Sequence, residues 1–521
     1  MSNTPKRKSA LLKLLGLFAA LALIATACGS DSVAEVAGDA AGEVDDAVNG
    51  DDGDDDGEAM EEEGDDEDAM VEEEDDDEGD DAEVDEAPAS DTVISGDFSG
   101  DTLTVAIVGN PTMEDIAALT PEFYTGAGGA TINYQFLEEQ TLREIVSIDT
   151  ATGAGDFDAV MIGPFEAPQF GQNGWLRGLN DTVDNDAAYD SGDLLPAVRG
   201  ALSADGELYA VPFYAESSFI MFNVDILEAA GQTMPPNPTW DEIAAIARAV
   251  DTDDVAGICL RGLPGWGDFG ASLTTVVNTF GGTWWEANAD GTPGEAQINQ
   301  ADSGFRAAFE FYVQLLEDAG EPDPEASSFG QCLEQIQDGS VAMWFDATVA
   351  AGILEGDDSP LRGNLGTALA PTGPAGADIG GGWLWSWALA IPTNSPNPDA
   401  AEEFIKWATS PEYIQIAGEN APGGWPSAPP GTRTSTYSIP EYVAASESFG
   451  QQTLDAINAA DPDNPGTTPR PGLPGVQYVG IPEFQGVGTD CTTQLARVLT
   501  GEFTVDEGLD ACQQIASVVS Q

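Results

Sequence analysis

Residues 103–108, Leu-Thr-Val-Ala-Ile-Val, form an apolar run rich in β-branched side chains, and the turn sequence Gly109-Asn110-Pro111 follows at once. A run of this length closed by turn residues is typical of a buried strand. The sequence outward from it alternates in the same way, with helical patterns at 113–119 and 141–150 and strand patterns at 132–136 and 157–162. Alternating strands and helices predict an α/β fold with a parallel sheet covered on both faces.

Two later helices are marked by their own signals. Thr239 is a suitable N-cap for a helix that runs to Ala249, and residues 397–407 form a second amphipathic segment. Trp240 and Trp407 lie within these two segments, so we expect both side chains in the core.

The composition excludes several classes of function. The chain has 521 residues, with 93 acidic and 15 basic side chains, a formal net charge of −78 and no histidine. Binding of nucleic acid or of an anionic membrane surface requires a basic face. Ser-His-Asp catalysis and histidine-ligated metal sites require histidine. Neither a CxxC pair nor a GxxxxGK[ST] loop is present, so we expect no zinc site, no bound cofactor and no ATP hydrolysis by this chain.

The N-terminal residues predict an export signal. Basic residues precede an apolar run of 14 residues, 14–27, whereas a membrane-spanning helix needs about 20. Small residues lead up to Cys28 and resemble a bacterial lipobox. We therefore expect residues 1–27 to be a lipoprotein signal peptide and Cys28 to be lipidated. The protein would then be anchored on the outer face of the cell membrane, or on the periplasmic side in a diderm envelope.

Residues 28–95 form an acidic segment. Residues 29–95 contain 32 acids and no Lys or Arg, and no aromatic residue occurs between Asp31 and Glu86. Such a segment buries too little apolar surface to offset chain entropy, and like charges extend it. We predict a disordered tether that holds the folded part, 96–521, away from the membrane. The folded part has a net charge of about −50, with Lys406 as its one lysine.

Four cysteines remain after Cys28, which in an exported chain suggests two disulfides with three possible pairings. Cys491 and Cys512 flank a pattern of helix, Gly501 and helix, a hairpin that would bring them together. We favour Cys491–Cys512, and with it Cys259–Cys332.

Several short sequences, in this order, resemble the family 1 extracellular solute-binding proteins of ABC sugar importers. The shared strings lie at 165–166, 174–176, 206–212, 218–223 and 238–242. Further strings resemble the sorbitol- and mannitol-binding branch of the family. These lie at 212–218, 259–267, 343–348, 383–387, 430–435 and 481–486. The resemblance covers about 100–515, nearly all of the folded part.

The resemblance implies a two-lobed α/β protein of the type II periplasmic-binding-protein fold, with a hinge and a ligand cleft between the lobes. By analogy, residues 96–212 and 380–428 form the first lobe, and residues 213–379 and 429–521 form the second. The implied function is capture of a polyol or related sugar by a monomer with no catalytic residues. The closed form would deliver its ligand to permease subunits that work with a cytoplasmic ATPase.

Polyol chemistry selects the candidate ligand-binding residues. Carboxylates accept hydrogen bonds from vicinal hydroxyls, Arg donates to them, and aromatic faces cover C–H surface. Residues of these types in loop-like strings are Glu139, Glu166, Tyr214, Glu216, Arg261, Trp266, Trp344, Asp346, Trp383 and Arg433. Glu138 is an alternative to Glu139, and Trp385 to Trp383.

Two other classes of protein remain open at this point. An exported glycoside hydrolase would use two of the many carboxylates. A surface adhesion protein carried on the acidic stalk would have no small-molecule cleft.

Overall fold

The computed structural model describes residues 92–374, 376–468 and 470–520. The predicted signal peptide, the lipidated Cys28 and the acidic tether as far as residue 91 lie outside this range. Within it, no helix has both the length and the apolar character needed to cross a membrane.

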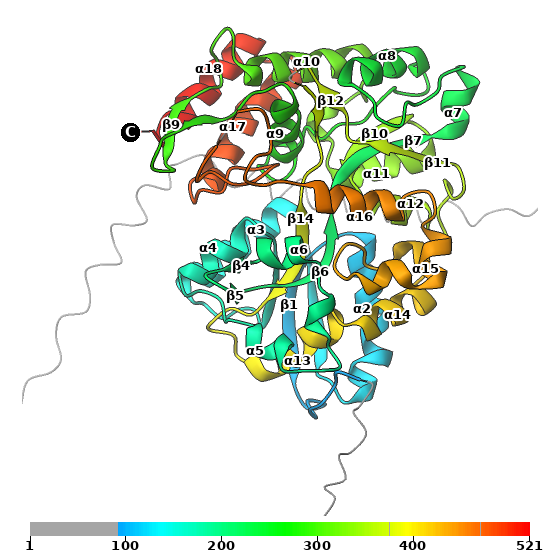
Figure 1. Cartoon of the computed structure of the whole chain (residues 1–521), viewed down its shortest axis with the longest axis vertical. Helices are drawn as coiled ribbons and strands as arrows, with labels where there is room; N and C mark the ends of the chain where they lie inside the picture. The colour runs from blue at the N-terminus through cyan, green and yellow to red at the C-terminus, as the bar shows by residue number, and fades with distance from the viewer. Residues whose placement is uncertain (1–91, 375, 469, 521) are drawn as a thin grey trace, which may run out of the picture. The chain divides into compact units, whose positions relative to one another are not determined.

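The first lobe is built on a five-stranded sheet (lower part of Figure 1). Its strand order is β2 (Thr131–Leu137), β1 (Thr102–Val108), β3 (Ala159–Ile162), β14 (Trp385–Ala390) and β6 (Val211–Glu216). The three strands predicted at the start of the chain are parallel, which confirms the alternation of the sequence. β14 runs antiparallel to both of its neighbours, so a strand from far along the chain completes this sheet.

Helices surround this sheet, and β4 (Ser203–Ala204) pairs with β5 (Glu207–Leu208) beside it. The helices are α2 (Pro111–Phe123), α3 (Glu139–Thr152), α4 (Glu166–Gln172), α5 (Asn180–Asp184), α6 (Pro196–Ala201), α13 (Pro398–Ala408), α14 (Pro411–Asn420) and α15 (Pro440–Ala445). α2 begins earlier than the sequence predicts, because the Asn110 side chain accepts from the Met113 amide and Pro111 occupies the first turn.

The second lobe contains a three-stranded antiparallel sheet, ordered β10 (Met343–Ala347), β7 (Ser218–Asn223) and β11 (Leu365–Leu369). Two small hairpins accompany it: β8 (Trp285–Ala287) with β9 (Pro293–Ala296), and β12 (Thr372–Gly373) with β13 (Gly376–Gly380). Its helices are α7 (Val224–Ala229), α8 (Trp240–Val250), α9 (Phe269–Thr279), α10 (Gly304–Ala319), α11 (Phe329–Asp338), α12 (Val349–Leu354), α17 (Phe484–Leu499) and α18 (Val505–Ala516). Thr239 and Glu242 form a capping box at the start of α8, and Trp240 is buried as expected.

The chain crosses between the lobes near Ser217, again at 381–384, and a third time around α16 (Gly450–Ala459). The first crossing lies about five residues beyond the boundary expected from the sequence, because β6 keeps pairing with β14 as far as Glu216. The structure also differs from the expected assignment of residues 430–434 to the second lobe. They bond to the first lobe, through Pro430 to Ala215 and Thr432 to Leu195, instead of belonging to the second. α16 lies along the boundary in Figure 1.

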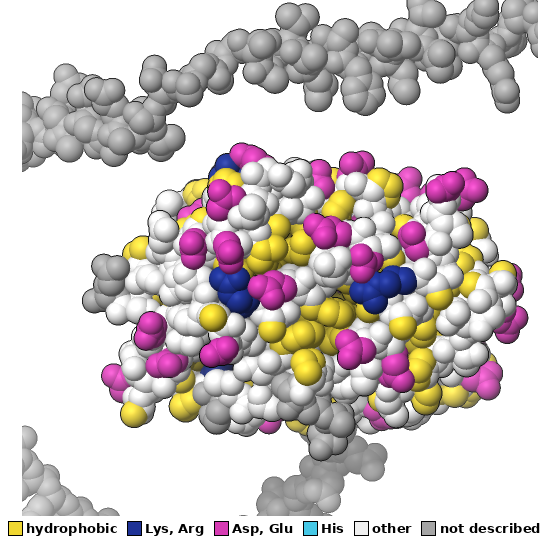
Figure 2. Space-filling model, turned by 90° about the horizontal axis from the view of Figure 1, so that it is seen from above, with side chains coloured by type: hydrophobic (Ala, Val, Ile, Leu, Met, Phe, Trp, Pro, Cys, Tyr) yellow, Lys and Arg dark blue, Asp and Glu magenta, His cyan; other side chains and the backbone are white. Residues whose placement is uncertain are grey.

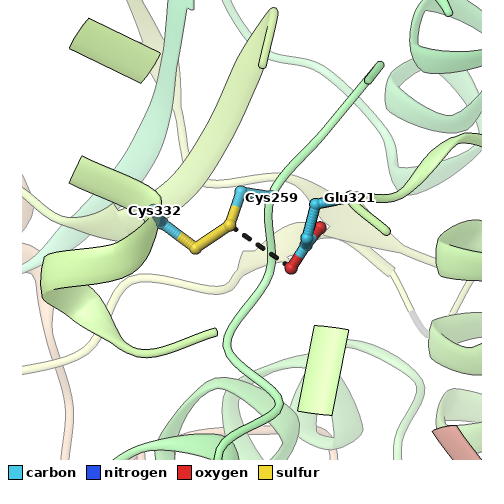
Figure 3. Close-up of side chains that lie close together, drawn as sticks. All are labelled: Cys259, Glu321 and Cys332. Atoms are coloured by element: carbon cyan, nitrogen blue, oxygen red, sulfur yellow. Dashed lines mark hydrogen bonds between the residues drawn. A yellow bond between two sulfur atoms is a disulfide. The ribbon is translucent and has the colours of Figure 1, made fainter. Parts of the chain in front are cut away.

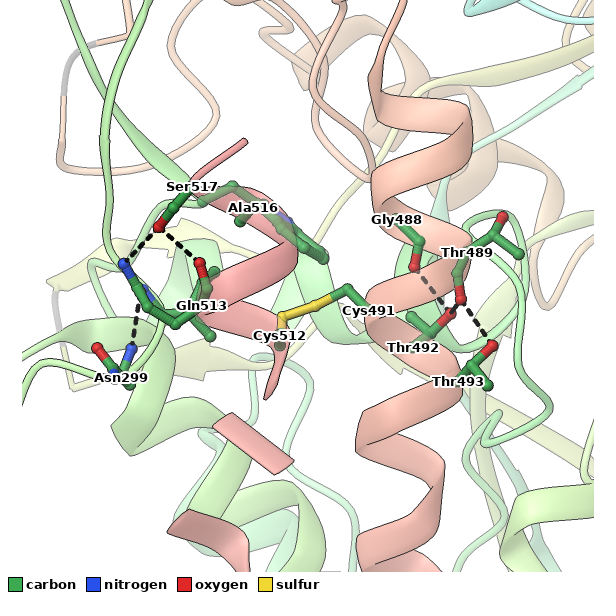
Figure 4. The surroundings of a disulfide bond; sticks show 12 residues. Asn299, Gly488, Thr489, Cys491, Thr492, Thr493, Cys512, Gln513, Ala516 and Ser517 are labelled. Atoms are coloured by element: carbon green, nitrogen blue, oxygen red, sulfur yellow. Dashed lines mark hydrogen bonds between the residues drawn. A yellow bond between two sulfur atoms is a disulfide. The ribbon is translucent and has the colours of Figure 1, made fainter. Parts of the chain in front are cut away.

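α17 and α18 form the helical hairpin expected near the C-terminus. Gly501 has a φ of +72°, a left-handed conformation that glycine adopts readily at the end of a helix. The turn places Cys491 and Cys512 side by side, and they form a disulfide (Figure 4). Cys259 and Cys332 form the second one, so the structure contains both pairings that the sequence favours.

Acidic side chains are spread over the face of the second lobe shown in Figure 2, and its few basic side chains lie beside them. Two ion pairs of the second lobe are Arg248 with Asp318 and Arg306 with Asp506. Within the described residues, most of the surface acids have no such partner, because the sequence has few bases to supply.

Candidate ligand-binding site

A cavity of about 350 Å³ lies between the lobes. The first lobe contributes the ends of β1 and β2 and the start of α3, where parallel α/β sheets usually present ligand-binding groups. The polar and aromatic residues that line it are Asn110, Phe136, Glu138, Glu139, Arg143, Tyr214, Glu216, Arg261, Trp266, Asp268, Ser328, Phe329, Trp383, Trp385, Trp387 and Gln477.

Arg143 of α3 is the cation of the first lobe at this cavity. It donates hydrogen bonds to Glu139, at 2.7 Å, and to Glu166, at 2.5 Å. Its guanidinium carbon also lies 4.2–4.9 Å from the centroids of three indole rings, those of Trp266, Trp385 and Trp387. Burial lowers the pKa of Arg143, but the two carboxylates outweigh burial and raise it, so the side chain stays charged.

Arg261 is the corresponding cation of the second lobe. Two of its nitrogens donate to the two oxygens of Asp346, each at 2.7 Å. The Trp344 indole donates to the same carboxylate at 3.0 Å. A third nitrogen of Arg261 lies 3.4 Å from Asp268 and 3.5 Å from Glu139. This paired geometry holds the guanidinium in one orientation.

Glu139 and the indole of Trp266 connect the two lobes across the cavity. Glu139 belongs to α3 but contacts Arg261, while Trp266 belongs to the second lobe but lies against Arg143. Ser147 and Gln485 add a hydrogen bond between α3 and α17 at 3.2 Å. The structure therefore has its lobes in contact around the cavity.

Three acidic groups in the cavity wall are strongly affected by burial. Burial raises the pKa of the Glu216 carboxyl well above its ordinary range, with Arg261 opposing the change and Asp346 adding to it. Burial and the charge of Glu139 raise the pKa of Asp268 in the same direction. Burial also raises the pKa of Tyr214, whose hydroxyl accepts a hydrogen bond from Asn110 at 3.1 Å.

Several polar atoms of the wall have no hydrogen-bond partner among the described residues. They are Nε1 of Trp266, Trp383 and Trp385, Nε of Arg143, Oδ2 of Asp268 and Oε1 of Gln477. Buried polar groups are normally satisfied, so an array of donors and acceptors around one cavity fits a ligand with many hydroxyl groups.

The structure brings together nine of the ten residues that the sequence singles out. Six line the cavity: Glu139, Tyr214, Glu216, Arg261, Trp266 and Trp383. The other three, Glu166, Trp344 and Asp346, lie behind the residues of the cavity wall. Glu166 accepts a hydrogen bond from Arg143, and Asp346 accepts from Arg261. The Trp344 indole donates to Asp346. These three residues do not line the cavity and affect it by orienting Arg143 and Arg261.

Arg433 is the exception, because the structure does not place it at the cavity. Its side chain is buried in the first lobe and donates to the carbonyl oxygens of Thr409 and Asp190. The guanidinium lies over the Tyr189 ring and 3.6 Å from Asp193. Arg433 thus attaches the 430–434 segment to the first lobe and does not line the cavity.

Sequence reasoning missed several residues of the wall, chiefly Arg143, Asp268, Asn110 and Gln477. A usable signal existed for Arg143, which follows Glu139 by four residues on one helix face and is one of few bases in the chain. The sequence around Asn110 indicates an N-cap of a helix, and Asn110 does cap α2 in addition to lining the cavity. Gln477 lies in an irregular loop and has no such signal.

The Cys259–Cys332 bridge lies beside the site, with the buried Glu321 against it (Figure 3). Cys259 precedes Arg261 by two residues, and Cys332 is in α11, whose first residues line the cavity. These three side chains are close enough to hold a metal ion, but the sulfurs are bonded to each other, so neither is a thiolate ligand. Burial raises the pKa of Glu321 to about 7.

Two α/β lobes, several crossings and a polar cavity lined from both sides define a binding protein that closes over a small solute. The family model of the bacterial extracellular solute-binding proteins matches residues 109–415, and the chain belongs to this family. Family membership sets aside the glycoside hydrolase and adhesion alternatives. The protein is an exported solute-binding protein and not an enzyme.

Relatives with known ligands support this placement. The chain is 37% identical over 417 residues to a mannitol-binding protein of Pseudomonas aeruginosa, covering 80% of this chain and 92% of that one. A solved solute-binding protein of an ABC transporter from Agrobacterium vitis, with bound D-mannitol, is 42% identical. Its TM-score is 0.76, and the match covers 80% of this chain and 98% of that one. A maltose-bound MalE3 of Thermotoga maritima is 20% identical over 80% of this chain and 99% of that one, with a TM-score of 0.66, and shares the fold.

Proposed function

We propose that this protein captures a linear polyol, mannitol or a close relative, in the cavity between its lobes and delivers it to an ABC importer. The observation that carries the proposal is the composition of the cavity wall, in which carboxylates, two arginines and indole groups face one another. The mannitol-binding relatives at 37% and 42% identity support the same ligand class.

The wall suits an open-chain polyol in three ways. Glu139, Glu216 and Asp268 accept from hydroxyl groups, while the free indole N–H groups of Trp383 and Trp385 donate to hydroxyl oxygens. The indole faces cover the C–H edges of the carbon chain. A cavity of about 350 Å³ lies at the small end of the range for ligand sites, roughly 300–1,000 Å³, which favours a monomeric polyol over an oligosaccharide.

Delivery follows from closure of the lobes. A ligand that contacts both lobes binds the closed form more tightly than the open form and so shifts the population toward it. In our proposal the closed monomer docks on permease subunits driven by a cytoplasmic ATPase. The lipid on Cys28 keeps it at the membrane, and the acidic segment serves as a tether.

Isothermal titration of the purified protein in high salt, at pH 7, tests the ligand class. The panel is D-mannitol, D-sorbitol, ribitol, D-glucose and maltose. We expect the tightest binding for a hexitol. At 1 mM ligand, a micromolar dissociation constant would also stabilise the fold by about 4 kcal/mol and raise the melting temperature by several degrees. Binding of maltose without binding of any polyol would contradict the proposal.

Anchoring is tested separately by membrane fractionation of cells that express the full chain. We expect the protein in the membrane fraction and a Cys28→Ser variant in the soluble fraction. An unchanged distribution would contradict a lipid anchor on Cys28.

A further inference from the structure

Both cations of the cavity are already paired with carboxylates. Arg143 is held by Glu139 and Glu166, and Arg261 by Asp346, with Glu139 and Asp268 also within 3.5 Å of it. Four carboxyl groups therefore surround two guanidinium groups. Glu216 also lines the cavity, so carboxyl groups outnumber guanidinium groups around the ligand position by five to two.

Two carboxyl groups of the wall remain available. The Glu216 side chain is 5% exposed and forms no hydrogen bond or ion pair with another residue in the described part of the chain. Asp268 is 2% exposed, and its Oδ2 has no partner, although its Oδ1 lies near Arg261. Burying a carboxylate oxygen without a hydrogen-bond partner costs free energy. A ligand group that donates a hydrogen bond to one of these oxygens therefore adds most to the binding free energy.

The aromatic part of the wall also accommodates positive charge. The Arg143 guanidinium already lies over the rings of Trp266, Trp385 and Trp387. The ring of Trp383 lines the cavity and is not among those three. An indole face attracts a cation in the same way whether the cation belongs to the protein or to a ligand.

The geometry points to a second class of ligand: polyols that carry an ammonium group, bound more tightly than the neutral polyol, with the ammonium at Glu216 and Asp268. This inference rests on the proposed function, because the rest of the ligand would be held as a polyol. A neutral hydroxyl donates one hydrogen bond to these carboxyl groups. An ammonium donates three, and its positive charge favours the ionised form of a carboxyl group that burial alone disfavours. Charge-assisted hydrogen bonds are roughly twice as strong as neutral ones.

The test compares D-mannitol with 1-amino-1-deoxy-D-mannitol, which differs in one terminal group and is charged at pH 7. Calorimetric titration of the full chain, in one buffer and at one ionic strength, gives both dissociation constants. We expect the amine to bind about tenfold more tightly, the ratio that about 1.4 kcal/mol produces. Equal or weaker binding of the amine overturns the inference. If mannitol still binds in that case, the proposed function stands, whereas absence of binding by both compounds overturns the two together.

Variants assign the ammonium position. Glu216→Gln should reduce the amine-to-mannitol preference to about one, and Asp268→Asn should reduce it in the same direction, so the test survives if one variant fails to fold. Glu228→Gln removes one charge from an exposed position on α7 and serves as the matched control. A preference that persists in both cavity variants overturns the assignment.

Discussion

The carboxylate of Glu139, in the first lobe, lies 3.5 Å from the guanidinium of Arg261, in the second. The same carboxylate accepts a hydrogen bond from Arg143 at 2.7 Å, within its own helix. One side chain therefore connects the cations of the two lobes across the cavity in this structure.

Replacing Glu139 with Gln should weaken polyol binding. The change keeps the size of the side chain but removes the charge that both arginines face, and a hydrogen bond to a charged group contributes about 1.5–3 kcal/mol. We expect the dissociation constant for mannitol, measured by calorimetry, to rise about tenfold to a hundredfold. Glu144→Gln, on the exposed side of the same helix, is the control. Equal affinities of Glu139→Gln and the control would show that the bridge between the lobes has no role in binding.

The two disulfides should have different effects on binding. Cys259–Cys332 joins the segment before Arg261 to α11, so removing it frees two parts of the cavity wall. We expect the Cys259→Ser/Cys332→Ser variant to lose about tenfold in mannitol affinity as well as stability. Loop-closure entropy alone suggests a stability loss of about 4 kcal/mol.

Cys491–Cys512 provides the matched comparison. It joins α17 to α18, and neither cysteine lines the cavity. Its removal should cost about 3 kcal/mol of stability with little change in affinity. Equal losses of affinity in the two double variants would refute a positioning role for Cys259–Cys332.

Glu321 should make the stability of the protein depend on pH. Its pKa is about 7 in the folded protein, because it is buried, against 4.5 as the ordinary value. A disulfide sulfur has no proton to donate, so the 3.3 Å contact between Glu321 and Cys259 is a hydrogen bond only when the carboxyl group is protonated. The protonated carboxyl group of Glu321 stabilises the folded protein fully below pH 4.5. This stabilisation, about 3 kcal/mol of the free energy of unfolding, is lost as the pH rises from 4.5 to 7.

Denaturant unfolding at pH 5 and pH 8 measures this effect. Glu321→Gln should reduce the fall in the free energy of unfolding between the two values. Glu317→Gln, at an exposed position on α10, should leave it unchanged. A Glu321→Gln variant with the full pH dependence of the parent would argue against this carboxyl group as its source.

Salt should stabilise this protein. The folded part carries a net charge of about −50, and the acidic face shown in Figure 2 has few basic side chains. Screening shortens the range of this repulsion from about 30 Å at 0.01 M salt to about 3 Å at 1 M. We expect the melting temperature to rise by several degrees between these conditions. An unchanged melting temperature would mean that surface repulsion contributes little to stability.

The local elements and the family can be predicted from the amino-acid sequence alone. Strand and helix patterns at 103–162 predict β1, α2, β2, α3 and β3 because periodicity and caps act over a few residues. The pattern of helix, Gly501 and helix is also local in the sequence, and it predicts the Cys491–Cys512 disulfide. Six predicted residues line the cavity: five lie in the strings that carry the family resemblance, and Glu139 follows β2 at the start of α3.

The contacts between distant segments could not be predicted from the sequence, because they depend on how the two lobes pack. Arg143 looks like a helical surface charge until Trp266, Trp385 and Trp387 enclose it. Arg433 looks like a loop donor for a ligand, yet its contacts place it in the interior of the first lobe. The environment of a charged side chain depends on elements hundreds of residues away. Sequence patterns therefore predict the chemical groups available, and the packing of the two lobes determines which of them face the ligand.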